Sequence, residues 1–513
     1  MKKNTKTIIN NSLVKSLFVV FLLSNQTIYF VSPVLSKNVT VLRIGVPIFP
    51  PQKGNPFSSI SLPLSLPNQA VYDPLFMNGS NGEVLPWLAT RWQQKNPNHW
   101  IFNIRKGVKF SNGENLDSDS VVAAFRYLLT PEGQRDSISS LNMAEILKNI
   151  NSLDSHTVEI ITNQPDPILP LHLVFMNIPA PHHWKDLGRD RFMISPVGTG
   201  PFIVEEWQEN FIRMAANPLS WRPPKIDFLE IIRIPDQTSR LQALLSGAID
   251  IALSLAPQNT LELDYLGAQL VNRSLQSLEF IAFVTQMESP LRDKRVKKAL
   301  NHAVNKEQMI DVFLNNATKP ASQFSHDGAF GFSPELKPYK YDPDKARSLL
   351  SSAGYQNGFK LPVLIASSSG GDNSSWYQQI AMDLEHVGVK MVLQTTPLTR
   401  MIQFVQSGKW PVPAFGWNFS GNDSLRGYRF RSCEWTNPYH CDPFLMPLIK
   451  AAKKADSFYD RQFLTQKVLA YERDNPPGIL LWRGVAFDGI GNNVKDFRTL
   501  NGFVSFHKIA LKD

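Results

Sequence analysis

Apolar and polar residues alternate in several short stretches of the chain, a pattern typical of strands that bury one face. Residues 42–46 form the first stretch and residues 100–104 form another. A turn at Gly107 would connect the strand at 100–104 to a further strand at 108–110, and Asn112-Gly113 marks a second tight turn. A helix capped by Asp117 or Ser118 should follow, because apolar residues then recur at helical spacing.

The second half of the chain interleaves helical and strand patterns. A helix is predicted from Asp293, and Asp342-Pro343 begins another that Gly354 closes. Residues 358–366 and 388–395 are predicted as parallel strands around a helix at 376–387. Strand–helix–strand order of this kind indicates an α/β sheet in this half.

The length of 513 residues predicts two or three domains. Lysines precede the apolar run Leu17–Leu23, and the short residues before position 37 suit a cleavage site, so residues 1–36 are predicted to be a signal peptide. The run is too short to span a membrane. Four of the charges behind the net +9 lie in this segment, and no lysine- or arginine-rich run elsewhere suggests nucleic-acid binding.

The chain has only two cysteines, Cys433 and Cys441. In the oxidising compartment that a signal peptide implies, they are predicted to form a disulfide that closes a small loop. A pair of metal ligands is the competing interpretation, but the spacing differs from the usual two to four residues.

Five motifs carry a family resemblance. They are "LATRWQ…WIFNIRKGVKFSNGENLDSDSVVAAF", "GTGPF", "ALLSGAIDIA", "LRDKRVKKALNHAVNKEQMI" and "YDPDKARSLLSSAGY". In this order, they resemble the solute-binding proteins of peptide/nickel-type ABC importers, and the resemblance covers nearly all of the chain after residue 36.

The resemblance implies an α/β fold of two lobes joined by crossing hinge strands, with an extra α+β domain on the first lobe. Lobe I would combine residues 37–78, 188–282 and 478–513, the extra domain would span 79–187, and lobe II would span 283–477. The solute would lie in the cleft between the lobes, and hinge closure would bury it.

The resemblance also places a binding strand in Phe415–Arg429. Gly416, Trp417 and Asn418 match the position where peptide-binding relatives offer backbone groups to an extended peptide. Trp417 would supply an apolar wall, or else belong to the core.

Such relatives carry an aspartate for the peptide's ammonium group where this chain has Ser420. Either Asp423 takes the amine instead, or the ligand has no free amine at that end.

The resemblance places further wall residues on the opposite side of the cleft, in the loop 57–66, and Tyr72 and Arg426 are further candidate cleft residues. Leu62 belongs to the uncharged loop 57–66, Tyr72 follows it, and Arg426 would suit a terminal carboxylate.

The sequence shows none of the common catalytic or nucleotide-binding motifs, so we expect a binding protein without a cofactor of its own. Its expected partners are an oligopeptide or peptide-like solute and the permease subunits of an ABC importer, and we expect a periplasmic monomer. A haem or metal-chelate carrier, and a peptide sensor or chaperone without transport, remain alternatives of the same fold.

Overall fold

The computed structural model describes residues 39–512 apart from 59–61, 80, 266 and 368–373, and omits the side chains of Ile138, Ser374, Phe419 and Ser420. The predicted signal peptide therefore lies outside the described residues. Residues 39–513 form one compact unit. No described helix is long and apolar enough to cross a membrane.

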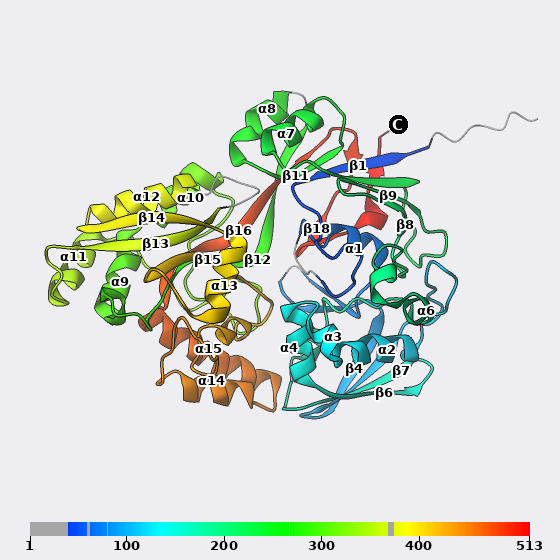
Figure 1. Ribbon diagram of the computed structural model, residues 1–513, viewed down its shortest axis with the longest axis horizontal. Helices are drawn as coiled ribbons and strands as arrows, with labels where there is room; N and C mark the ends of the chain where they lie inside the picture. Colours follow the sequence, from blue (N-terminus) through cyan, green and yellow to red (C-terminus); the bar gives the residue numbers. More distant parts are fainter. Residues whose placement is uncertain (1–38, 59–61, 80, 266, 368–373, 513) are drawn as a thin grey trace, which may run out of the picture. The chain divides into compact units, whose positions relative to one another are not determined.

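A mixed sheet of ten strands organises this unit (Figure 1). In spatial order its strands are β14 (Val389–Pro397), β13 (Phe359–Ser367), β15 (Ala414–Ser420), β12 (Gln269–Phe283), β16 (Gly478–Ile490), β11 (Ile251–Leu255), β1 (Val41–Val46), β10 (Phe228–Arg233), β9 (Phe211–Ala216) and β8 (Phe202–Trp207). β13 and β14 pair in parallel, as predicted. The predicted α/β class is confirmed.

Two long strands, β12 and β16, join the two halves of this sheet. The first part of β12 pairs with residues 485–490 of β16, beside β11, and its last part lies between β16 and β15. Figure 1 shows both strands running from the β11 region into the half that contains β13–β15. The pairing is irregular between Ser274 and Leu278 and again between Glu279 and Phe280. The crossing strands therefore contain bulges where they pass from one half to the other.

A four-stranded antiparallel sheet lies in the segment predicted as the extra domain. Its order is β4 (Ala89–Asn96), β5 (His99–Ile104), β7 (Thr157–Thr162) and β6 (Leu147–Asp154), with helices α2 (Ser118–Leu128), α3 (Pro131–Gln134) and α4 (Ile138–Ile146). Asp117 caps α2 by accepting a hydrogen bond from the backbone N–H of Ser120. The predicted strand at 108–110 is wrong, because only one bridge forms there, between Lys109 and Asn115.

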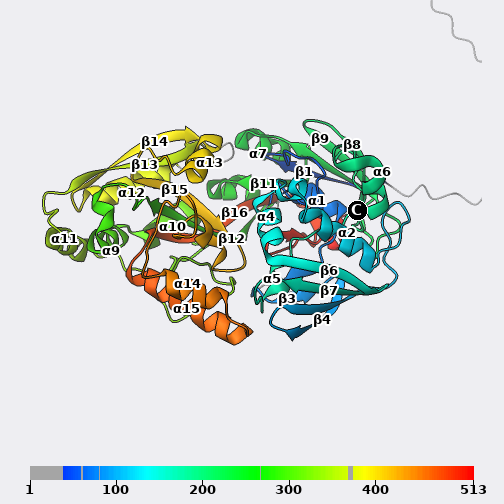
Figure 2. The ribbon, with the colours of Figure 1, turned by 60° about the horizontal axis from the view of Figure 1, so that its bottom comes forward.

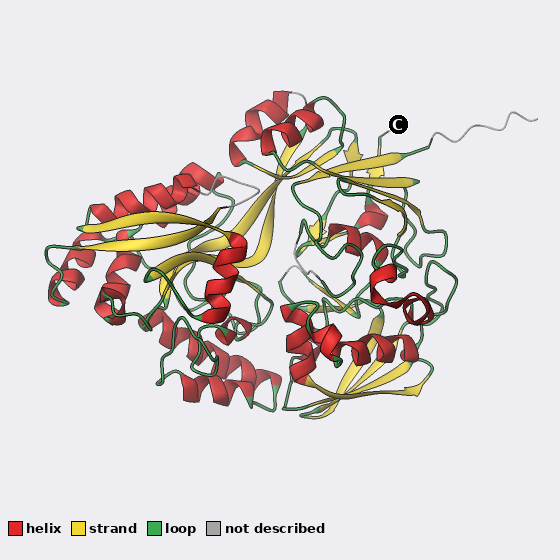
Figure 3. Ribbon diagram, in the orientation of Figure 1, coloured by secondary structure: helices red, strands yellow, loops and turns green. Residues whose placement is uncertain are grey.

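Helices cover the sheet in the second half of the chain (Figure 3). They are α9 (Lys294–Ala303), α10 (Lys306–Leu314), α11 (Pro343–Ser352), α12 (Ser374–Glu385) and α13 (Leu398–Ser407). The helices α14 (Met446–Lys453) and α15 (Phe458–Asp474) pack against each other in a separate buried cluster. As predicted, Asp342 caps α11 and Gly354, at φ +88°, follows its end. The apolar faces of α9 and α12 pack with Leu361, Val363 and Val389 of the sheet in one buried cluster.

The remaining elements complete the first half. The helices are α1 (Leu66–Val71), α5 (Leu169–His172), α6 (Pro181–Phe192), α7 (Gln237–Leu245) and α8 (Thr260–Tyr265). The short strand pairs are β2 (Phe76–Asn78) with β3 (Val84–Pro86), β17 (Val494–Lys495) with β20 (Ala510–Leu511), and β18 (Thr499–Leu500) with β19 (Phe503–Val504). The exact domain bounds given above remain a prediction.

Candidate binding site

A cavity of about 790 Å³ lies between residues that are far apart in the sequence. One wall comes from 139–176, which include α4 and α5, and the other comes from 423–461, which include α14 and the start of α15. In Figure 2 these helices face one another across the lower part of the molecule. The volume falls within the range typical of small-molecule pockets. We call this space the basic cavity.

Charge is unevenly distributed on the cavity walls. Six lysine and arginine side chains and His172 line it, against four carboxylates. Apolar surface is contributed by Met143, Ile146, Phe175, Met176, Leu425 and Trp435. Such a lining suits a solute that has both apolar groups and negative charge.

Ion pairs connect the two walls at His172. Its Nδ1 lies 2.9 Å from Asp166 Oδ2, and its Nε2 lies 3.5 Å from Asp423 Oδ2. Burial alone would lower the pKa of His172, but the two carboxylates outweigh it and raise the pKa to about 9. The imidazole is therefore positively charged at neutral pH and bridges α5 to the loop after β15.

The carboxylate of Asp423 already has hydrogen-bond and ion-pair partners within the protein. It accepts a hydrogen bond from the backbone N–H of Leu425 at 3.0 Å, and Arg461 Nη2 lies 3.4 Å from its Oδ2. Burial would raise the pKa of Asp423, but His172 and Arg461 outweigh it and lower the pKa to about 2. A ligand ammonium group would have to compete with two cations already present.

Arginines on the 3₁₀ turn Arg426–Arg429 make the other contacts across the cavity. Arg426 Nη2 donates to Ser139 Oγ at 2.6 Å. Arg429 Nη1 donates to Asn142 Oδ1 at 2.8 Å and to Glu145 Oε2 at 2.9 Å. The predicted ligand residue Arg426 thus lies on the cavity wall.

Two lysines of the cavity carry uncompensated charge. Lys450, on α14, and Lys454, directly after it, are one helical turn apart. The side chains of both lack an ion pair with any residue the structure describes, whereas the neighbouring Lys453 contacts Glu434 at 2.7 Å. Lys450 and Lys454 were not predicted as site residues, although their spacing in "LIKAAKK" could have indicated a basic helix face.

The predicted binding strand is β15, and one of its edges is open. β15 pairs with β12 along its whole length, from Ala414 to Ser420. On the other side, β13 pairs with it only at Ala414 and Phe415. In the described part of the chain, no strand pairs with that edge from Gly416 onward, so its backbone groups are free to receive an added strand.

The predicted residues of β15 differ in surroundings. A Cβ on the buried Gly416 would lie 2.1 Å from the hydroxyl oxygen of Tyr377, so only glycine fits there. Trp417 is partly buried against Phe415, with ring centroids 6.0 Å apart, and Asn418 is exposed. The side chain of Ser420 lies outside those described, so the prediction for it stays untested.

Two predicted wall residues lie away from the basic cavity. Tyr72 is completely buried, and its hydroxyl donates to the carbonyl oxygen of Gly54 at 2.6 Å. This arrangement argues against a ligand contact by Tyr72. Leu62 is partly buried against the core of the first half.

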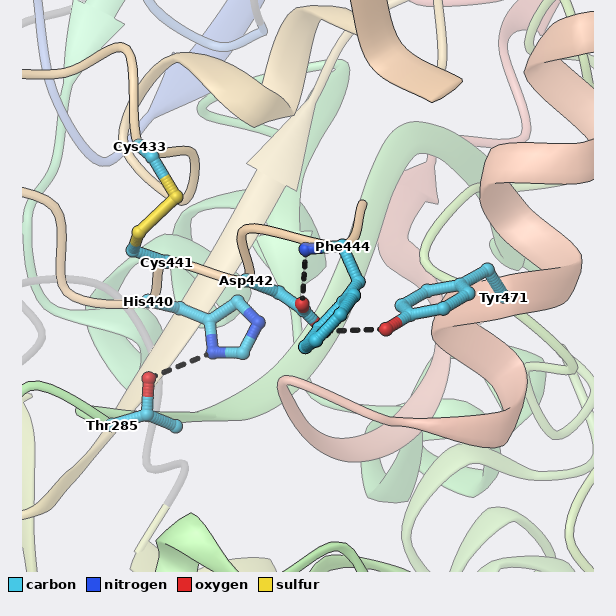
Figure 4. The surroundings of a disulfide bond; sticks show 7 residues. All are labelled: Thr285, Cys433, His440, Cys441, Asp442, Phe444 and Tyr471. Carbon is cyan, nitrogen blue, oxygen red and sulfur yellow. Dashed lines mark hydrogen bonds between the residues drawn. A yellow bond between two sulfur atoms is a disulfide. The ribbon is translucent and has the colours of Figure 1, made fainter. Parts of the chain in front are cut away.

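Cys433 and Cys441 form a disulfide, as predicted, with Cα atoms 4.8 Å apart (Figure 4). The chain on one side of it is anchored, because His440 Nδ1 lies 3.0 Å from Thr285 Oγ1 and Asp442 accepts from the Tyr471 hydroxyl at 3.0 Å. The loop between the cysteines supplies Glu434, Trp435 and Thr436 to the basic cavity. The disulfide therefore holds part of the cavity wall in place.

The described residues hold no group of three or more His, Cys, Asp or Glu side chains arranged for a metal ion.

Comparison with known proteins identifies the family. The profile of the bacterial extracellular solute-binding proteins, family 5, matches residues 83–435. Haem-binding protein A of Haemophilus influenzae is 28% identical over 389 residues, which cover 69% of this chain and 70% of that protein. The dipeptide-binding protein of Escherichia coli is 24% identical over 448 residues, with 81% and 84% covered.

The fold is shared with solved structures. NikA of Brucella suis, crystallised with Fe(III)-EDTA, superposes with a TM-score of 0.80 at 22% identity, covering 92% of this chain and all of that one. The two-lobed architecture expected from the sequence is therefore present. The chain belongs to the bacterial extracellular solute-binding proteins of family 5.

Proposed function

We propose that this protein is the solute-binding component of an ABC importer and that it captures an oligopeptide or peptide-like solute. The observation that carries the proposal is the basic cavity, which is lined from two separate parts of the chain and is large enough for a short peptide. The protein performs no chemistry in this role, since ATP hydrolysis belongs to the transporter.

Two features suit a peptide. The open edge of β15 at Gly416–Asn418 would add an extended peptide as a further strand, which gives affinity independent of its side chains. Arg426, Lys450 and Lys454 would receive its terminal carboxylate or acidic side chains. The bound solute would hold both walls together, as His172 and Arg429 already do through direct contacts.

The proposed role implies a cellular location and a processing step. We propose that residues 1–36 are removed on export and that the protein acts as a periplasmic monomer with the permease as its partner. N-terminal sequencing of protein from the periplasmic fraction tests the cleavage. Co-purification with a permease distinguishes uptake from a sensor or chaperone role.

The direct test is ligand binding by the purified mature protein. Native mass spectrometry would identify solutes that co-purify, and a panel of short peptides should raise the melting temperature by mass action. Calorimetry should give one site per chain. Absence of any shift with all peptides, together with a shift caused by another solute class, would overturn the peptide assignment.

A haem or metal-chelate carrier is the second candidate. The excess of positive charge and the apolar surface of Met143, Phe175 and Met176 would also fit an apolar ring system with carboxylates or a polycarboxylate chelate. Haemin titration followed by absorbance, and nickel or iron offered as citrate or EDTA complexes, test this candidate beside the peptides.

A further inference from the structure

Glu279 differs from the paired, buried carboxylates of this protein because no described residue partners it. Asp73 is paired with Arg222, Asp488 with Arg273, and Glu472 with Arg431. The carboxylate of Glu279, by contrast, makes neither a hydrogen bond nor an ion pair with any described residue. Burial, which is the sole cause, raises the pKa of Glu279 to about 8. An ionised carboxylate in such a place is costly unless a cation joins it.

The position of Glu279 is set by the crossing strands. It stands directly opposite Asn418 of β15 on one side and opposite Trp482 of β16 on the other. The bulge between Glu279 and Phe280 adjoins it. Bulges of this kind re-aim side chains and are frequent next to functional sites.

Among the described residues, no positively charged group pairs with Glu279. Asn418 and Trp482 are uncharged, and from α12 the hydroxyl of Tyr377 lies beside the Cβ position of Gly416 on the neighbouring strand. Burial raises the pKa of Tyr377, and the nearby Glu279 raises it further, so the phenol is neutral at physiological pH. Glu279 itself is partly exposed and Asn418 is exposed. Glu279, on β12, is therefore one strand away from the open edge of β15, with the exposed Asn418 between them.

We infer that Glu279, one strand in from the open edge of β15, is the binding residue for an ammonium group of the solute. This inference rests on the proposed peptide function. The ammonium group would form a charge-assisted hydrogen bond with the Glu279 carboxylate, and the amide oxygen of Asn418 would accept a second hydrogen bond. Asp423 is unsuited to this role because Arg461 and His172 already neutralise it.

A solute bound in this way has a defined direction. Its positive end would lie at Glu279, beside Gly416–Asn418, and its negative end would reach Lys450 and Lys454 in the basic cavity. Asp423, three residues after the end of β15, would lie along its length rather than at its positive end.

Proton release provides the test. At pH 7 the carboxylic acid of Glu279 is mostly protonated, and pairing with an ammonium ion would make it ionise. Calorimetry of one peptide in phosphate and in Tris, whose ionisation enthalpies differ, should therefore show the release of most of a proton per peptide bound. The N-acetylated form of the same peptide should bind at least tenfold more weakly and release no proton.

Variants complete the test. Glu279→Gln should lose the proton release and bind the free-amine peptide about as weakly as the acetylated one. Glu385→Gln, an exposed change at the end of α12, should behave as wild type. The comparison of the two peptides on the wild-type protein needs no variant, so a folding defect in Glu279→Gln would not spoil it.

The two proposals fail in different ways. Peptides that bind with no proton release, and equally well with and without acetylation, would overturn the role of Glu279 and leave peptide binding intact. If neither form of any peptide binds, the proposed function itself is overturned.

Discussion

The open edge of β15 and the basic cavity use opposite ways to prepare for a solute. At the edge, no described strand pairs with the backbone groups from Gly416 onward, and on the adjacent strand β12 no described cation pairs with the carboxylate of Glu279. In the cavity, most charges are already paired, and the contacts of His172 with Asp423 and of Arg429 with Glu145 connect its two walls. The open edge of β15 therefore gains its partner only when a solute binds, whereas the walls of the basic cavity are already joined without one.

This contrast separates binding from stability. Removing a charge from the paired network leaves its partner buried and alone, which costs folding free energy. Removing an unpaired charge costs little stability but should cost affinity. Variants in the two regions should therefore differ in which quantity changes.

The largest effect on stability is expected from Asp423→Asn. The change leaves Arg461 and the protonated His172 without their shared anion, so the free energy of unfolding should fall by about 3 kcal/mol. Urea denaturation measures it. Asp264→Asn, at an exposed position on α8, is the matched control and should change the stability by less than about 0.5 kcal/mol. Unchanged stability of Asp423→Asn would show that the cavity network is not held as described.

The same network makes stability depend on pH. The pKa of His172 is raised to about 9, so its contribution is fully present below the unfolded value of about 6.5 and is lost as the pH rises toward 9. The loss should approach about 3 kcal/mol. Asp423 affects stability at acidic pH. Its contribution to stability is present above about pH 4 and is lost as the pH falls toward 2.

Melting temperatures measured between pH 6 and 9 test whether His172 causes this pH dependence. His172→Gln should be less stable than wild type at pH 6 and should show a flatter decline toward pH 9. Equal slopes in the two proteins would exclude His172 as the source of the decline.

The disulfide is expected to have the next largest effect. The two cysteines are 8 residues apart, so the chain-entropy estimate gives about 2.5 kcal/mol for the bond. The double variant Cys433→Ser, Cys441→Ser should lose that amount in urea denaturation. Reductant should lower the free energy of unfolding of the wild type to that of the variant. It should leave the variant unchanged, because the chain has no other cysteine. Persistence of full stability in the variant would contradict a structural role for the bond.

Local sequence signals predicted much of the fold, and the family resemblance predicted the strand β15. Asp117 and Asp342 cap their helices as the local pattern predicts, and Gly416–Asn418 lie on the strand that the family resemblance places there. The strand β4 was missed because its residues 93–96 are all polar or charged. Local patterns work where neighbours in sequence are also neighbours in space.

The basic cavity depends instead on tertiary contacts. Asp166 and Asp423 are joined through His172, and nothing local in "PDPILPLHL" indicates a bridge to a residue in the other half of the chain. Glu279 had a weak signal, an acidic residue between Leu278 and Phe280 in an apolar strand. Its lack of a partner became visible only when the register of β12, β15 and β16 was known.

The smallest effect is expected from the lysines that the network leaves unpaired. Replacing both Lys450 and Lys454 with Gln should leave stability nearly unchanged, because no ion pair within the described chain is broken. The affinity for a peptide with a free terminal carboxylate should fall about threefold to tenfold, and the loss should shrink at high salt because both side chains are exposed. The amidated form of the same peptide should bind wild type and variant equally. Replacing the exposed Lys360 on β13 and Lys390 on β14 with Gln provides a charge-matched control. If the double variant lost affinity for both forms alike, the lysines would act on the shape of the cavity rather than on the charge of the solute, and the direction assigned to the peptide would have to be abandoned.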